Sequence, residues 1–205
     1  MIYIPNLVSI LLLALYSQGA LKAPISDALQ RLQAKVSVES LASVDMSGIA
    51  GRYTNPSKEL VRRIGGVLSG DDLYLFPDGT YIYCEWSDVQ PLTIYDKGKW
   101  TFTNGAVELK SDPDVKWDPK ADRTYVAVRR QSHPKEILLV GLRRDLPYFE
   151  QEVRDDPESM LLIVSKGRRG KLTQASKRVK TRLLEQSWHP EDFKEIPTDS
   201  GKPHR

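Results

Sequence analysis

Residues 72–86 read Asp-Leu-Tyr-Leu-Phe-Pro-Asp-Gly-Thr-Tyr-Ile-Tyr-Cys-Glu-Trp and carry the strongest structural signal in the chain. At their centre Pro77-Asp78-Gly79 combines a proline, which presets φ for a turn, with a glycine that is free to take positive φ. The residues on both sides are rich in tyrosine and other aromatic or β-branched side chains, which favour strands. The pattern predicts a β-hairpin formed by residues 72–76 and 80–86.

A second hairpin signal follows at Asn104-Gly105, the residue pair that favours a type I′ turn. Before it Gly98, Trp100 and Phe102 alternate with polar residues, the period of a strand with one polar face. In all, the following ranges are expected to be strands: 49–54, 72–76, 80–86, 97–103, 106–110, 124–130, 136–142 and 160–165. Short turns join most of them without βαβ alternation, which predicts a mainly β fold, a single antiparallel meander of about eight strands closed as a barrel or folded as a sandwich.

Helices are expected only at the periphery, at the N- and C-terminal ends and after Asn55-Pro56, where a short helix would end at Gly65-Gly66. Apolar stripes at helical spacing occur in residues 25–36 and 172–183. The predicted organisation is a signal peptide over 1–19, an N-terminal helical segment over 20–48, a β-meander domain over 49–165, a basic C-terminal helix over 166–193 packed on it, and a disordered tail over 194–205.

An apolar run from Leu7 to Tyr16 precedes the small residues Ser17, Gly19 and Ala20, which is the layout of a secretory signal peptide. This predicts an extracytoplasmic protein, periplasmic or secreted. The run has no Lys or Arg before it, and about 20 uncharged residues could span a bilayer, so a retained membrane anchor and a buried core segment stay as alternatives. The membrane is a partner only if the segment is retained.

Gly51-Arg52-Tyr53, on the first expected strand, is similar to the Gly-x-Trp opening of the lipocalins, with tyrosine in place of tryptophan. A short helical insertion before the meander is similar to that of the fatty-acid-binding proteins. Over residues 49–165 the chain therefore resembles the calycin β-barrels, although the later lipocalin motifs are not visible. Its Asp-Gly-Thr-Tyr hairpin also resembles small exported bacterial β-meander proteins of unknown function. These resemblances imply a barrel, whose interior could hold a small amphipathic ligand.

One face of the predicted strand 80–86 carries Tyr81, Tyr83 and Glu85. Pointing inward, these side chains would line a pocket with hydroxyl groups and a carboxylate, and pointing outward they would form cross-strand pairs on a solvated sheet. Trp100 and Trp117 complete the candidate ligand-binding set, and Trp117 has the alternative of covering one end of the barrel. Cys84 is the only cysteine, so an intramolecular disulfide is excluded.

The segment from Ser159 to Leu184 is basic and contains no acidic residue. Its eight cations are Lys166, Arg168, Arg169, Lys171, Lys177, Arg178, Lys180 and Arg182. Such a segment could bind an anionic envelope polymer or a protein partner in a salt-sensitive way, or it could be a solvated helix face docked on the acidic sheet. Export makes nucleic acid an unexpected partner.

Catalytic and metal signals are weak. Asp112, Asp114, Asp118 and Asp122 crowd one loop, but their spacing is not that of a calcium loop, so no metal or cofactor is expected. His133 and His189 each precede a proline and lie beside no nucleophile motif. A hydrolase using either histidine is therefore the least favoured alternative, and no catalytic residue is assigned.

Overall fold

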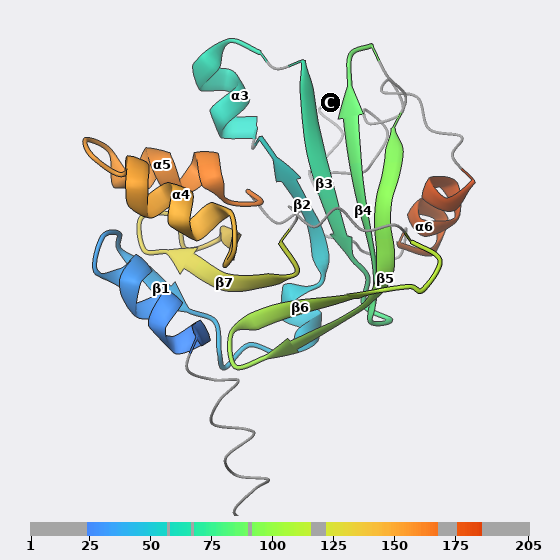
Figure 1. Ribbon diagram of the computed structural model, residues 1–205, viewed down its shortest axis with the longest axis horizontal. Helices are drawn as coiled ribbons and strands as arrows, with labels where there is room; N and C mark the ends of the chain where they lie inside the picture. The colour runs from blue at the N-terminus through green and yellow to red at the C-terminus, as the bar shows by residue number, and fades with distance from the viewer. Residues whose placement is uncertain are drawn as a thin grey trace, which may run out of the picture.

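The computed structural model describes residues 24–56, 58–66, 68–89, 92–115, 122–167 and 176–185. In these residues one antiparallel sheet of eight strands is flanked by helices (Figure 1). The strands are β1 (Val38–Ser40), β2 (Gly51–Asn55), β3 (Ser69–Leu75), β4 (Thr80–Ser87), β5 (Thr93–Thr103), β6 (Ala106–Ser111), β7 (Thr124–Arg130) and β8 (Ile137–Gly141). The expected mainly β meander is confirmed, and its sheet does not close into a barrel.

The helices lie around the sheet. They comprise a helix over residues 24–33 (blue in Figure 1), α2 (Met46–Ile49), α3 (Lys58–Ile64), α4 (Asp145–Glu152), α5 (Pro157–Val164) and α6 (Ser176–Leu184). The short helix expected before Gly65-Gly66 is confirmed as α3, and both glycines have positive φ. In the segments that the structure describes, no helix is long and apolar enough to cross a bilayer. The predicted signal segment lies outside the described residues.

Hairpins set the topology. Strands β2 to β6 pair in sequence order, and β7 pairs with β6 at one end, with β1 at the other and with β8 along its opposite side. The turn at Asn104-Gly105 has φ of 53° and 83°, as a type I′ turn requires, and Gly79 has φ of 78°. Both turn signals are therefore confirmed, and the open sheet ends at β2 and β8.

Alternating residues divide the sheet into an inner and an outer face. In β3, Leu73 and Leu75 point into the inner core, whereas Tyr74, with Phe76 just after the strand, belongs to an outer cluster with Val179 and Leu183 of α6. On the other wing, the outer face of β7 and β8 is covered by the 24–33 helix, α4 and α5. Helices thus cover both outer wings and leave part of the inner face for a cavity.

The expected strand at residues 160–165 is wrong, because this segment is α5. Asp156 accepts a hydrogen bond from the backbone of Ser159, and Pro157 occupies the first turn, so the helix starts before the apolar run. Short apolar runs do not distinguish a strand from a buried helix. Ser165 forms only an isolated bridge to Val140. The three-residue β1 and helix α4 were not expected.

Candidate functional site

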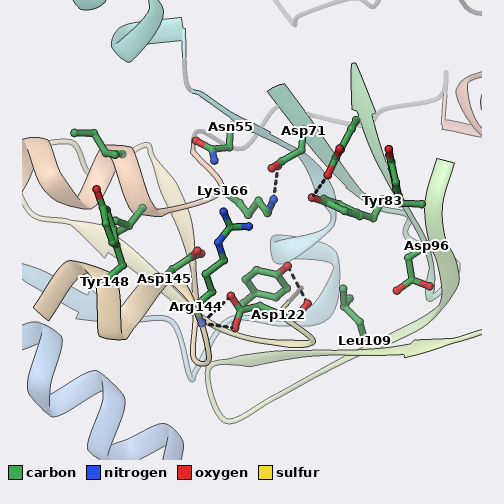
Figure 2. A pocket seen from close by; sticks show the side chains of 15 residues that line it. Asn55, Asp71, Tyr83, Asp96, Leu109, Asp122, Arg144, Asp145, Tyr148 and Lys166 are labelled. Atoms are coloured by element: carbon green, nitrogen blue, oxygen red, sulfur yellow. Dashed lines mark hydrogen bonds and ion pairs between the residues drawn. The ribbon is translucent and has the colours of Figure 1, made fainter. Parts of the chain in front are cut away.

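A cavity of about 500 Å³ is lined by the inner face of the sheet and by residues at the start of α4 and the end of α5 (Figure 2). Its size is in the range typical of small-molecule sites, roughly 300–1,000 Å³. Among the described residues its wall holds five carboxylates, Asp71, Glu85, Asp96, Asp122 and Asp145. Two cations, Arg144 and Lys166, face them. The wall therefore carries a surplus of acidic side chains.

A β-bulge shapes the sheet side of the cavity. Tyr83 of β4 pairs with Asp96 of β5, but the next residue, Cys84, pairs with Ile94, so Tyr95 is an extra residue on β5. Bulges redirect side chains next to binding sites. Here Tyr95 and Asp96, although adjacent in the chain, both line the cavity.

Lys166 bridges the open side of the sheet. Its backbone N–H donates to the Leu139 carbonyl over 2.8 Å, which holds the segment after α5 against β8. Its buried side chain reaches across to β3, where the ammonium forms an ion pair with Asp71 and lies 4.7 Å from the centre of the Tyr83 ring. Figure 2 shows this contact in the middle of the cavity.

Asp122 fixes the turn that begins α4. Its Oδ1 accepts hydrogen bonds from the backbone N–H groups of Arg143, over 2.5 Å, and Arg144, over 3.1 Å. The backbone N–H of Gly141 donates to Asp145 Oδ2 over 2.9 Å. A Cβ at Gly141 would lie 2.1 Å from Asp122 Oδ2, so only glycine fits here. This packing sets Asp145 on the cavity wall.

Burial raises the pKa of Asp145 to about 7. The Gly141 N–H and Lys166 oppose this shift, whereas the carboxylates of Asp122 and Asp71 add to it. Burial also raises the pKa of Tyr83 and Tyr125, with nearby carboxylates contributing, so both phenols stay neutral at physiological pH. The cavity therefore offers neutral hydroxyl groups and carboxylates, one of which titrates near pH 7.

Three aromatic or apolar side chains of the cavity wall are partly exposed. They are Tyr95, Tyr148 and Ile163, which are 46%, 48% and 39% exposed. Large apolar side chains that are half exposed around a polar cavity can contact the apolar part of a bound molecule. The site therefore combines charged groups with partly exposed apolar surface.

Of the five candidate ligand-binding residues, four are described, and two of these line the cavity. Tyr83 and Glu85 line the cavity, with the Tyr83 hydroxyl 3.3 Å from Glu85 Oε1. Tyr81 is buried behind the wall, and Trp100 is a core residue, 2% exposed, whose indole N–H donates to the Phe76 carbonyl. Trp117 lies outside the described residues. The Tyr81–Glu85 face thus points inward.

Two of the eight basic residues of the 166–182 segment have described side chains, and these two lie on different faces of the sheet. Lys166 is inside the cavity, and Lys180 of α6 is at the outer face, 3.0 Å from Asp78 Oδ2. Arg168, Arg169 and Lys171 lie outside the described residues, and Lys177, Arg178 and Arg182 belong to α6 without described side chains. Lys166 thus pairs with Asp71 of β3, and Lys180 pairs with Asp78 of the turn between β3 and β4.

Of the weaker candidates, Asp122 lines the cavity, whereas His133 and Asp114 do not. His133 is exposed at the β7–β8 turn, where its Nδ1 lies 3.0 Å from Ser132 Oγ, and His189 is outside the described residues. Asp114 of the acidic loop pairs with Lys97 over 3.5 Å, and Asp118 is not described. In the described part of the chain no group of three or more His, Cys, Asp or Glu residues is arranged to hold a metal.

Sequence reasoning missed Asp71, Asp96 and Asp145 as members of one site. Aspartate is depleted in strands, so the pair Asp71-Asp72 inside β3 is a signal that could have been used. Asp96 is positioned by a bulge, and Asp145 by a helix that was not expected, so neither had a recognisable local pattern.

The chain matches no family model, no curated protein and no solved structure.

Proposed function

We propose that this chain is a binding protein whose cavity takes a small amphipathic molecule with a positively charged head group. The observation that carries the proposal is the composition of the wall, in which carboxylates outnumber cations and Tyr95, Tyr148 and Ile163 supply partly exposed apolar surface. Small-ligand sites combine apolar surface with a few convergent polar groups. The acidic surplus favours a cationic ligand.

The cavity already stabilises one ammonium group. Lys166 is 8% exposed, and its Nζ is held by the Asp71 carboxylate and by the face of the Tyr83 ring. A carboxylate together with an aromatic face is a common environment for a bound ammonium. The same wall has further carboxylates and tyrosines, so it can accommodate the ammonium of a ligand by the same chemistry.

A ligand against the inner face of an antiparallel meander is also what the calycin resemblance implies. In this proposal Tyr83 and Glu85 remain ligand-contacting residues, and the head group of the ligand carries a positive charge. The sign of this charge can be tested, because ligands that share one apolar part and carry opposite head-group charges differ in little else.

Titration with phenylbutylamine, phenylbutanol and phenylbutyrate tests the charge preference. We expect phenylbutylamine to bind at least about tenfold more tightly than phenylbutyrate in isothermal titration calorimetry at low salt, since the carboxylates attract one and repel the other. Added salt should narrow this difference. Equal affinities, or tighter binding of phenylbutyrate, would contradict the proposal.

We also propose that binding takes place outside the cytoplasm, on the support of the apolar run from Leu7 to Tyr16. N-terminal sequencing of the protein recovered from its producing cells should begin at Ala20, after removal of the first 19 residues. Recovery of the chain with Met1 intact would contradict release, and its extraction with the membrane fraction would support the anchored form.

A further inference from the structure

Asp96 is a carboxylate of the cavity wall whose hydrogen bonding is incomplete. The side chain is 5% exposed, and its Oδ2 accepts a 2.7 Å hydrogen bond from the Tyr81 hydroxyl. Its Oδ1 is buried and has no hydrogen-bond partner in the part of the chain that the structure describes. A buried carboxylate oxygen without a donor is costly and uncommon in native proteins.

The surrounding strands hold Asp96 in this position. The bulge at Tyr95 directs it to the cavity, and the Tyr81 hydroxyl that binds its other oxygen also lies 3.1 Å from Ser111 Oγ on β6. Its orientation is therefore fixed by two neighbouring strands before any ligand enters. Figure 2 places Asp96 at the opposite end of the cavity from Tyr148.

We infer that Asp96 anchors the ligand, with Oδ1 accepting a hydrogen bond from an N–H of a primary or secondary ammonium group. This inference rests on the proposed function and narrows the ligand class from any cationic amphiphile to an amine that carries a donor hydrogen. A quaternary ammonium has the charge but no N–H, so it leaves Oδ1 unpaired. Sites built to hydrogen-bond a ligand group discriminate strongly against an analogue that lacks it.

The first test compares phenylbutylamine with its N,N,N-trimethyl analogue on the full chain. We expect the primary amine to bind at least about tenfold more tightly, measured by calorimetry and by amide shifts in nuclear magnetic resonance spectra. Equal binding of the two cations would overturn the role of Asp96 and leave the proposed function standing. If neither cation bound, both proposals would fail.

The second test uses Asp96→Asn, with Glu108→Gln as its control. Asparagine keeps the acceptor for Tyr81 but removes the charge and the second acceptor oxygen, so affinity for phenylbutylamine should fall about 10- to 100-fold and the preference over the trimethyl analogue should be lost. Glu108 is exposed on β6 and does not line the cavity, so its variant removes one negative charge elsewhere on the sheet. An unchanged preference in Asp96→Asn would overturn the inference. If that variant did not fold, the comparison of the two cations on the unmodified chain would still decide it.

Discussion

Replacing Asp72 with alanine is expected to lower the free energy of unfolding by about 3–5 kcal/mol, the largest effect of any single change considered for this chain. Asp72 is fully buried on the outer face of β3, where its two oxygens accept hydrogen bonds from Arg52 over 3.1 and 2.9 Å. Arg52 is itself only 17% exposed. Removal of the carboxylate leaves this guanidinium buried without its main counter-charge, which is the costly case for a buried ion pair. Urea denaturation measures the loss.

A double replacement separates this penalty from the net contribution of the ion pair. Arg52→Met combined with Asp72→Leu removes both charges and keeps apolar volume, and we expect it to recover most of the stability lost in Asp72→Ala. Asp88→Ala is the matched control, because this exposed aspartate follows β4 and should change stability by less than about 0.5 kcal/mol. A loss below about 1 kcal/mol in Asp72→Ala would contradict the argument.

Asp71 and Asp72 show how one strand serves two purposes. Because successive side chains of a strand point to opposite faces, Asp71 reaches the cavity and Lys166, whereas Asp72 is held under the outer cluster by Arg52. The buried pair on the outer face therefore helps to hold the register of β2 and β3 that brings Asp71 to the site. The ion pair on the outer face of β3 therefore supports the position of Asp71 on the inner face.

Local signals predicted most of the sheet. The turns at Asp78-Gly79 and Asn104-Gly105 depend on residues that tolerate positive φ, and both hairpins are where these residues indicate. The failure at residues 160–165 has a physical reason, because Met-Leu-Leu-Ile-Val has no polar residue to reveal its period. Its helical state depends on the cap at Asp156 and on packing against β8.

The site was predicted only in part, because its members meet through tertiary structure. Period two put Tyr83 and Glu85 on one face, but the sequence did not say which face is inner. Lys166 belongs to the basic segment of the sequence, but its pairing with Asp71 depends on a contact between residues 95 positions apart. The β5 bulge that places Asp96 requires a register that a single sequence does not reveal.

The stability of the chain should decline as pH rises from about 4 to 7, through the titration of Asp145. This carboxyl has its usual pKa of 3.8 in the unfolded chain and about 7 in the folded chain. Between these values the folded state keeps a proton that the unfolded state has released, so raising the pH favours unfolding. The slope should be on the order of 1 kcal/mol per pH unit inside the window and should vanish above it. Ionisation of Asp145 also adds a negative charge to the cavity wall, so phenylbutylamine should bind more tightly above pH 7.

Asp145→Asn isolates this effect from the other carboxylates that titrate in the same range. Its amide oxygen can still accept the Gly141 N–H, so the variant should match the unmodified chain near pH 4 and exceed its melting temperature by several degrees at pH 8. Glu152→Gln removes an exposed carboxylate at the other end of α4 and should leave the pH profile unchanged. Carbon-13 titration of the Asp145 carboxyl gives the midpoint directly. A midpoint below about 5, or an Asp145→Asn profile parallel to that of the unmodified chain, would show that burial and the neighbouring carboxylates do not hold this proton.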